Sequence, residues 1–212
     1  MKRFQIVTES DARVLDYGSS IVLVRGGHVT PLAADTLRSR RISVVRESGG
    51  SDDDARLAPV SPVRTVAIAG DHTSLALKAA LVAHLRGRGI AAHDLGTTGT
   101  EPVDYPDTAA AAARLVARGE ADAAIVIDGA GLGSTIAANK VAGARAAMCL
   151  NQTLARYARE HNGANVLALG ATLVSTEEAR AVVDTFLDTP MNEPRYIRRL
   201  AKIRDLEQRT GG

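Results

Sequence analysis

The sequence has little of several residue types, and each shortage excludes a class of protein. Its 212 residues include one cysteine, Cys149, which excludes an intramolecular disulfide and a multi-cysteine metal site. It has no tryptophan, 3% aromatic residues and a formal net charge of +2. These values do not fit the basic surface with stacking aromatic rings that nucleic-acid-binding proteins use. We therefore expect no nucleic-acid partner.

Long apolar runs are also missing. No stretch reaches the roughly 20 apolar residues that a membrane helix needs, and the first residues, MKRFQIVTESD, lack the apolar run of a signal peptide. With 45% hydrophobic residues, the sequence has enough apolar material for a packed core. We therefore expect a globular, cytoplasmic protein that does not associate with membranes.

An irregular stretch, ESGGSDDDARLAPVSP, divides the chain. It contains adjacent glycines, three adjacent aspartates and two prolines, with no apolar period, which is typical of a linker. We expect an acidic flexible linker over residues 48–62. It would join a small N-terminal docking or interaction module, residues 1–47, to a larger domain, residues 63–212.

The larger domain alternates short apolar segments with helical ones. The sequence predicts five strands, over residues 63–69, 90–95, 123–127, 144–150 and 166–169. Helical patterns follow, with leucines at 77, 81 and 85 and with the segments 108–118, 152–160, 176–187 and 195–209. This order predicts an α/β fold in which helices cover both faces of a five-stranded parallel sheet.

The module of residues 1–47 shows a different pattern. We expect strands over residues 20–25 and 42–45 and a helix over 31–41, capped by Thr30 and begun by Pro31, in a small α+β arrangement. Forty-seven residues are marginal for independent stability, so we expect this module to dock on another surface.

Ligands of open parallel sheets bind beyond the carboxyl ends of the strands, where the strand order reverses. Asp71 and His72 follow the first predicted strand of the larger domain, and DGAGLGS, residues 128–134, follows the third. The glycines of that turn let backbone N–H groups approach an anion closely. Their spacing is neither GxGxxG nor GxxxxGK[ST], which disfavours a nucleotide-binding protein. A plain tight turn is the alternative reading.

Four further side chains could take part in chemistry. His72 and His161 could act as acids or bases near neutral pH, although Asp71-His72 could also be a helix cap and His161 a structural loop residue. Arg195 and Arg199 lie four residues apart on one helix face and could clamp a phosphate. The alternative for these arginines is a solvated charged helix.

Residues 63–209 resemble the family of B-type ribose-5-phosphate isomerases and galactose-6-phosphate isomerase subunits. The resemblance rests on five segments in the same order: AIAGDHTSLALK, HDLGTTGTEPVDYPD, GEADAAIVIDGAGLGSTIAANKVAGARAAMC, AREHNGANVLALGA and PRYIRRLAKI. It implies a Rossmann-like three-layer fold and a homodimer, or a dimer of dimers, with each active site shared between subunits. It also implies aldose–ketose isomerisation of a sugar phosphate through a cis-enediolate, without metal or organic cofactor.

The resemblance assigns roles by position. Asp71 would contact the sugar, His72 would contact the substrate or its phosphate, and Tyr105 would line the pocket. His161 with Asn162 would open the sugar ring. The remaining assignments are the amides of Gly129, Gly131 and Gly133, which would face the developing oxyanion, and the side chains of Arg195 and Arg199, which would hold the phosphate.

The chain departs from the family's pattern at several positions. Asp128 replaces the catalytic cysteine, and Ser134 stands where one branch has a glutamate base; we place Ser134 among the substrate-binding residues. Ala130 replaces a threonine, Thr172 replaces a phosphate-binding arginine, and Pro194-Arg195-Tyr196 replaces Gly-Arg-His. We hypothesise that Asp128 is the catalytic base. The alternative is a catalytically weakened relative that binds a phosphorylated sugar or serves assembly.

The N-terminal module carries a second, shorter resemblance. TPLAADTLRSRRISVV, preceded by TESDAR, is similar to the N-terminal segment of ethanolamine-utilisation corrinoid adenosyltransferases and some other bacterial-microcompartment proteins. It implies a microcompartment shell or cargo partner for residues 1–47, and hence a location inside a microcompartment.

Overall fold

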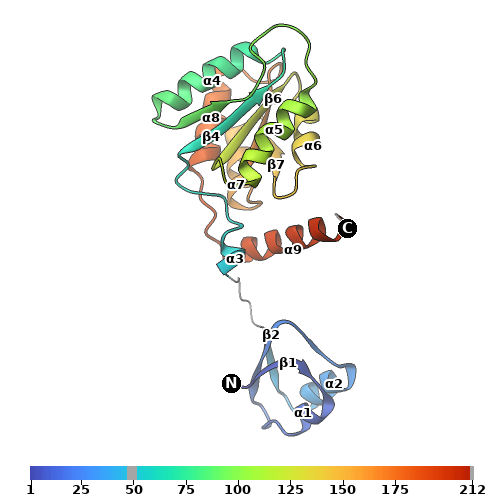
Figure 1. The fold of residues 1–212 in the computed structure, drawn as a ribbon. Coiled ribbons are helices and arrows are strands. Elements are labelled where there is room, and N and C mark those ends of the chain that lie inside the picture. Colours follow the sequence, from blue (N-terminus) through green and yellow to red (C-terminus); the bar gives the residue numbers. More distant parts are fainter. Residues whose placement is uncertain (47–51, 211–212) are drawn as a thin grey trace. The chain divides into compact units, whose positions relative to one another are not determined.

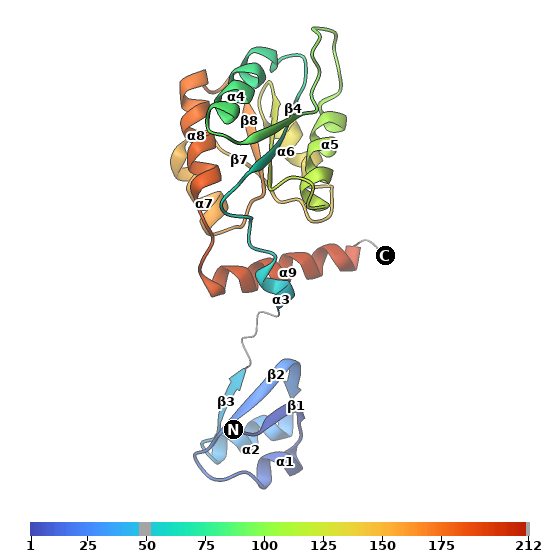
Figure 2. The same cartoon turned by 60° about the vertical axis from the view of Figure 1, so that its left-hand side comes forward.

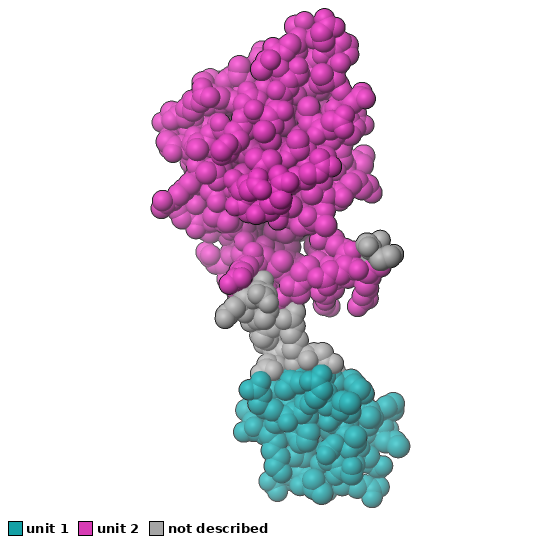
Figure 3. Space-filling model, in the orientation of Figure 1, with its two compact units in different colours: residues 1–51 teal, residues 52–212 magenta. Residues whose placement is uncertain are grey.

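The chain divides into two compact units, residues 1–51 and residues 52–212, which Figure 3 shows in different colours. The structure, a computed structural model, describes residues 1–46 and 52–210. The division between the units lies inside the stretch expected to be a linker.

Unit 1 holds a three-stranded parallel sheet in the order β1-β2-β3. Its elements alternate along the chain: β1 (Arg3–Val7), α1 (Glu9–Arg13), β2 (Ser20–Val29), α2 (Pro31–Ser39) and β3 (Ser43–Arg46). This alternation differs from the α+β arrangement expected, because the short elements β1 and α1 were not recognised in the sequence. Thr30 caps α2 as predicted: its side chain accepts a hydrogen bond from the backbone N–H of Ala33.

Unit 2 is built on a five-stranded parallel sheet in the order β5-β4-β6-β8-β7. The strands are β4 (Thr65–Gly70), β5 (Ala91–Asp94), β6 (Ala123–Asp128), β7 (Ala146–Met148) and β8 (Val166–Gly170). Each lies within or close to one of the five predicted strand segments. Every residue of β6 and β8 is buried, as expected for central strands covered on both faces.

Helices cover both faces of this sheet (Figures 1 and 2). On one face lie α4 (Leu75–Gly87), α7 (Gln152–Glu160) and α8 (Thr176–Asp188), with Leu77, Leu81 and Leu85 in the core beneath them. On the other lie α5 (Tyr105–Ala117) and α6 (Leu132–Ala138), packed through small alanine side chains. The three-layer α/β/α prediction is confirmed. None of the helices in the described residues has the length and apolar content that a membrane span requires.

Two further helices stand outside these layers. The long α9 (Pro194–Thr210) packs against the short α3 (Asp52–Ala55), as Figure 2 shows. Residues 52–62 therefore differ from the flexible linker expected of their composition: Asp54 is buried and pairs with Arg204 of α9, with Nη1 and Oδ1 3.0 Å apart. Composition alone does not show a cation 150 residues further along the chain. The rest of the predicted linker, residues 48–51, lies outside the described residues.

Candidate active site

The strand order of unit 2 reverses between β4 and β6. The chain leaves β4 for β5 on one side of it and then returns to β6 on the other side. Such a reversal leaves a crevice at the carboxyl ends of the two strands, where open α/β sheets bind ligands. Asp71 and His72 follow β4, and Asp128 is the last residue of β6, so the predicted strand-end residues meet at this crevice.

Asp71 is held by the turn that follows β4. Its buried carboxylate accepts hydrogen bonds at Oδ1 from the backbone N–H of Thr73 (2.9 Å) and from the Thr73 hydroxyl (2.6 Å). Its own N–H donates to the carbonyl oxygen of Ile127 on β6, 3.2 Å away. Both side-chain bonds use Oδ1, so Oδ2 can accept a hydrogen bond from a sugar hydroxyl.

His72 is oriented by the loop between β5 and α5. Its Nδ1 accepts a hydrogen bond from the backbone N–H of Val103, 3.3 Å away. The ring proton then lies on Nε2, which can donate to an anionic group. Tyr105 follows two residues later and lies over Gly133 of α6: a Cβ added to Gly133 would be 2.5 Å from the Tyr105 ring. Tyr105 thus lies against the start of α6, and its role in lining the pocket stays a prediction.

Asp128 fills the anion-binding turn that the glycines form. Its buried carboxylate accepts three backbone N–H bonds, at Oδ1 from Ala130 (2.9 Å) and Gly131 and at Oδ2 from Ser134 (2.7 Å). The Gly131 amide was expected to face a substrate oxyanion, but it donates to Asp128 instead, because the carboxylate is the nearest anion. The roles assigned to Gly129 and Gly133 stay predictions.

The glycine-rich turn also requires glycine for steric reasons. Gly131 has φ of +78°, and a Cβ there would lie 2.9 Å from the backbone nitrogen of Gly170. A Cβ on Gly170 would in turn lie 2.7 Å from the carbonyl of Ala130. Thr172, at the position of the family's arginine, donates its hydroxyl to the Gly129 carbonyl oxygen, 2.7 Å away. The loops after β6 and β8 are therefore in direct backbone contact.

Ser134 contributes more than its backbone N–H. Its Oγ is buried and has no hydrogen-bond partner among the residues that the structure describes. A buried hydroxyl without a partner is costly unless a ligand or water satisfies it. The substrate-binding role predicted for Ser134 stays a prediction.

The other predicted residues form a second cluster, around Tyr196. The ring of His161, the residue that follows α7, stacks on Tyr157 and packs at a tilt of 35° against Tyr196, with both pairs of ring centroids 4.7 Å apart. The guanidinium of Arg195 lies 4.7 Å from the centre of the Tyr196 ring, and its Nη2 donates to the Tyr196 hydroxyl at 3.0 Å. The Arg199 guanidinium lies 5.4 Å from the same ring. Tyr196 thus links the predicted ring-opening histidine to both predicted phosphate-binding arginines.

Sequence patterns did not indicate the part that two tyrosines play in this cluster. Tyr157 was not singled out, although its spacing of four residues from His161 places both on one helix face. Tyr196 stands where the family has a histidine, and no pattern in the neighbouring sequence indicates that its ring packs against His161. Asn162 is exposed, and its Nδ2 donates to the carbonyl oxygen of Tyr157 at 3.0 Å.

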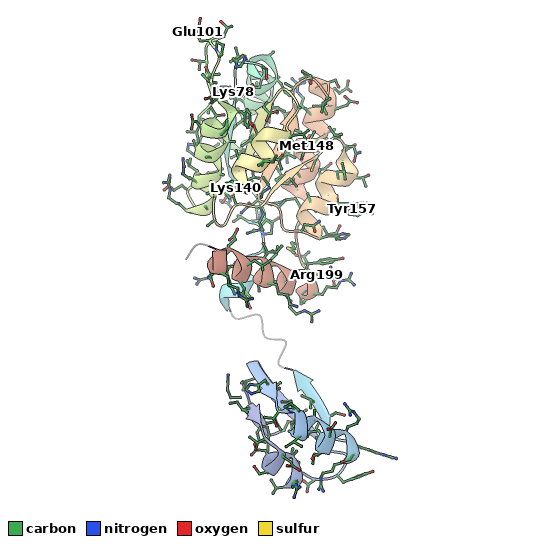
Figure 4. All side chains as sticks on the ribbon, turned by 90° about the vertical axis from the view of Figure 1, so that its right-hand side faces the viewer. Lys78, Glu101, Lys140, Met148, Tyr157 and Arg199 are labelled. Atoms are coloured by element: carbon green, nitrogen blue, oxygen red, sulfur yellow. The ribbon has the colours of Figure 1, made fainter. Side chains whose placement is uncertain are left out.

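The two clusters lie at opposite ends of the sheet. The carboxyl-end cluster (Asp71, His72, Tyr105 and Asp128) follows or flanks strand ends, whereas the amino-end cluster (His161, Asn162, Arg195, Tyr196 and Arg199) lies around the start of β8. The six residues of β6 span roughly 20 Å. Figure 4 shows the same separation between Glu101, in the loop before α5, and Arg199 on α9. One copy of the chain therefore does not bring all predicted site residues together.

A buried ion pair supports the loop that carries Val103 and Tyr105. Lys78 of α4 is buried, with its Nζ 2.5 Å from Asp94 Oδ1, and the same oxygen accepts the backbone N–H of Gly96 at 3.1 Å. The leucine period of this helix leaves Lys78 on another face than Leu77, Leu81 and Leu85, and nothing in that period indicates the ion pair. Among the described residues, no group of three or more His, Cys, Asp or Glu side chains could hold a metal ion.

Comparison with known proteins identifies relatives of unit 2. The model of the ribose/galactose isomerase family matches residues 66–203. Ribose-5-phosphate isomerase B of Escherichia coli (strain K12) is 42% identical over 147 residues, which cover 69% of this chain and 99% of that protein.

Solved structures agree with this match. The structure of Clostridium thermocellum ribose-5-phosphate isomerase B has a TM-score of 0.68 and 44% identity, covering 69% of this chain and 99% of that one. The structure of ribose-5-phosphate isomerase B from Mycoplasma genitalium with bound ribulose-5-phosphate has a TM-score of 0.66 and 38% identity, covering 68% and 96%. Residues 1–65 lie outside the family match. With the matched fold and the strand-end site together, the chain belongs to the ribose/galactose isomerase family of sugar-phosphate isomerases.

Proposed function

We propose that the chain interconverts an aldose phosphate and a ketose phosphate of the ribose-5-phosphate and ribulose-5-phosphate type. The observation that carries this proposal is the buried carboxylate of Asp128 at the strand-order reversal, beside Asp71 and His72. The names of the relatives support the same substrate class.

The reaction needs a base that moves a proton between two neighbouring carbons. Asp128 Oδ2 accepts one amide hydrogen bond and keeps a second lone pair, which can take the proton from C2 of the open-chain aldose. The electron pair of the C2–H bond then forms the C1–C2 double bond of the enediolate. The C1=O electron pair moves onto O1, and the proton of the C2 hydroxyl is transferred to O1. Return of the C2 proton from Asp128 to C1 then gives the ketose. Asp128 ends the cycle ionised, as it began.

The amino-end cluster would supply the remaining steps. His161 with Asn162 would transfer the protons that open the sugar ring, and Arg195 and Arg199 would hold the phosphate together with the Nε2 proton of His72. These roles suit the chemistry of the groups, because guanidinium and imidazole N–H groups are strong donors to phosphate oxygens.

We propose further that the active site forms between two copies of the chain, in a homodimer or a dimer of dimers. The carboxyl-end cluster of one copy would meet the amino-end cluster of the other, since neither is complete alone. Exposed apolar side chains around α6 and α7 support such an interface. They are Leu132, Ile136, Leu150, Leu154, Tyr157 and Leu173.

The variant Ile136→Glu tests this dimer. Ile136 is 63% exposed, so a glutamate there leaves the fold of unit 2 intact and places a charge in the interface. We expect light scattering to show dissociation, and turnover to fall in proportion to the monomer fraction. The matched control, Val14→Glu on the exposed surface of unit 1, should change neither. Full turnover by a monomeric Ile136→Glu protein would contradict the shared site.

The variant Asp128→Asn tests the base. Asparagine keeps an oxygen for the amides of Ala130 and Gly131 but cannot take the proton, so we expect turnover to fall by about 10²–10⁴-fold. The measurement is deuterium exchange from solvent at C2 across a panel of aldose and ketose phosphates. Unchanged exchange by Asp128→Asn would sink the assignment.

In Asp128→Asn the side-chain NH₂ group would face the Ser134 N–H, and two donors cannot form a hydrogen bond, so this variant could also lose stability. A second variant therefore separates loss of the base from misfolding. Asp128→Cys provides a group that can act as a base without a second donor, so it should regain part of the exchange lost in Asp128→Asn. Melting curves of both variants separate loss of the base from loss of the fold.

The alternative, a weakened relative that binds a phosphorylated sugar or serves assembly, has one specific observation in its favour. Three backbone amides of the glycine-rich turn are occupied by Asp128, and Thr172 binds a backbone carbonyl where a cation would face the phosphate. Binding of ribose 5-phosphate without any C2 exchange across the panel would favour this reading.

We also propose that residues 1–47 dock on a partner, with a bacterial-microcompartment shell or cargo protein as the candidate, in a protein otherwise located in the cytoplasm. Unit 1 has its own core and lies outside the family match, which supports a role separate from the isomerase. Deleting residues 1–50 should abolish partner association and change the location of the protein. Unchanged association and location would contradict the docking role.

A further inference from the structure

We propose that residues 52–62, which we call the strap, position the amino-end cluster for substrate binding, so that a segment outside the family match forms part of the active site's support. The inference rests on the proposed function of that cluster. Three separate sets of contacts between the strap and the rest of unit 2 support the proposal.

The first contact is ionic and fixes the middle of α9. Asp54 of the strap has a side chain only 4% exposed, and its Oδ1 lies 3.0 Å from Nη1 of Arg204. A second nitrogen of the same guanidinium lies 3.3 Å from Asp205 Oδ1. Arg204 is five residues beyond Arg199 on one continuous helix. Holding Arg204 therefore limits the rotation and sliding of the helix that carries Arg195 and Arg199.

The second contact is apolar and involves the small core that contains Tyr196. Leu57 and Ala58 of the strap pack against a small core formed by Met191, Tyr196 and Leu200. Tyr196 is in turn the residue against whose ring His161 packs and over which both arginine side chains lie. The strap thus packs against the small core that contains the residue at the centre of the amino-end cluster.

The third contact joins the strap to two arginines of the sheet domain, the partly buried Arg145 and the buried Arg159. Nη2 of Arg145 donates to the Leu57 carbonyl oxygen, and Nη2 of Arg159 donates to the Val60 carbonyl oxygen, each at 2.9 Å. Arg159 is fully buried, two residues before His161, and also donates to the Ala164 carbonyl oxygen at 3.0 Å. Burial, followed by the charge of Arg145, lowers the pKa of Arg159 to about 10. The strap carbonyls therefore satisfy cations that burial disfavours, and one of these cations adjoins the ring-opening histidine.

These contacts converge on residues that bind substrate in the proposed function. A loosened strap would let α9 and the end of α7 move, which weakens phosphate binding in the ground state and transition state alike. Such a loss raises KM and leaves kcat nearly unchanged. The strap residues are positioning residues, because none of them reaches the substrate itself.

The test uses three variants of the full chain. Asp54→Asn removes the ion pair, Leu57→Ala removes the apolar contact, and Asp54→Glu restores the charge. The matched control is Asp188→Asn, which breaks the exposed ion pair between Asp188 and Arg88, neither of which belongs to the strap or to α9. For each protein, KM and kcat are measured with ribose 5-phosphate, and amide hydrogen exchange is followed over residues 194–204.

For Asp54→Asn and Leu57→Ala we expect KM to rise about three- to tenfold while kcat changes by less than about twofold. Exchange over residues 194–204 should become faster in both variants. Asp54→Glu should recover most of the lost affinity, and Asp188→Asn should match the unaltered chain.

Two outcomes would overturn the strap proposal. Unchanged exchange in Asp54→Asn and Leu57→Ala would show that the strap does not hold α9. Faster exchange with unchanged KM would show that it holds the helix without positioning the site. If the unaltered chain isomerises no sugar phosphate, the proposed function fails by itself. The strap proposal is then tested by amide hydrogen exchange and by the Kd for inorganic phosphate. Faster exchange and a higher Kd in Asp54→Asn and Leu57→Ala would support the proposal, and an unchanged Kd would overturn it.

Discussion

At the scale of single residues, Asp128 shows how one substitution changes the use of a whole turn. A glycine-rich turn offers backbone N–H groups to whatever anion reaches it, and here the anion is the side chain of the chain's own Asp128. The carboxylate is thereby fixed in orientation before substrate arrives, which favours a base with a single productive geometry. In the proposed reaction the enediolate oxygens need donors other than these amides, and the buried Ser134 hydroxyl has no partner among the described residues.

Cys149 lies just after β7, and its thiol should take no part in the reaction. It is buried, and this burial raises the pKa of the thiol from 9.0 to about 12, so the reactive thiolate is scarce at neutral pH. We expect Cys149→Ala to keep the turnover of the unaltered chain. A thiol reagent should label the native protein slowly and the urea-unfolded protein quickly.

The same pKa predicts how stability depends on pH. Between pH 9 and about 12 the folded state keeps the thiol proton that the unfolded chain loses, so the folded state binds more protons. The contribution to stability is present below pH 9 and is lost as the pH rises through this range. Urea unfolding of Cys149→Ala should show a smaller loss of stability above pH 9 than the unaltered chain. Equal losses would contradict the burial of this thiol.

At the scale of elements, how well the sequence predicts each helix or strand depends on how local its signal is. The segment predicted as a helix over 152–160 has the observed bounds of α7, because Asn151 caps its start and accepts the Leu154 N–H. The apolar runs of β6 and β8 were equally clear. In contrast, β1 and α1 have five residues each, too few for a period to show.

The same dependence on local signals applies to the site residues. Parallel strands end at one edge, so the strand-end residues Asp71 and Asp128 could be placed together from the sequence. The ring contact between His161 and Tyr196 joins residues 35 positions apart, and the contact of Asp54 with Arg204 joins residues 150 positions apart. No pattern in either segment records such a contact, because only the folded chain brings the two together.

The contact between the starts of α5 and α6 gives a prediction at this scale. Gly133 lies in α6, where alanine is the better helix former by about 0.8–1 kcal/mol. A Cβ there would lie 2.5 Å from the Tyr105 ring, which is 39% exposed and can swing away. We therefore expect Gly133→Ala to keep or raise the melting temperature while kcat/KM falls by about ten- to a hundredfold.

Its matched control is Gly87→Ala at the end of α4, where a Cβ would meet no atom within 4 Å. This variant should keep full kcat/KM. Unimpaired kcat/KM in Gly133→Ala would show that the position of Tyr105 does not matter to the reaction.

At the scale of the whole molecule, the two units have separate cores, and the strap belongs to unit 2. The core of unit 1 includes Val7, Ile21, Leu23 and Leu37, and none of the core clusters found in the described residues contains residues of both units. The strap makes the contacts described here with Arg145, Arg159 and α9, all in unit 2. We therefore expect changes in the strap and changes in unit 1 to affect the isomerase domain differently.

This separation predicts that unit 1 can unfold without loss of catalysis. Leu37 is 3% exposed, and Leu37→Ala should cost about 2–5 kcal/mol, a large share of the stability of so small a unit. Calorimetry should show the transition of unit 1 moved to lower temperature and that of unit 2 unchanged, with full turnover. Leu81→Ala in the core of unit 2 is the control, and it should move the other transition and reduce turnover at temperatures where unit 2 begins to unfold. A lower turnover of Leu37→Ala would show that unit 1 also supports the active site. The conclusion that only the strap, and not unit 1, gives this support would then be wrong.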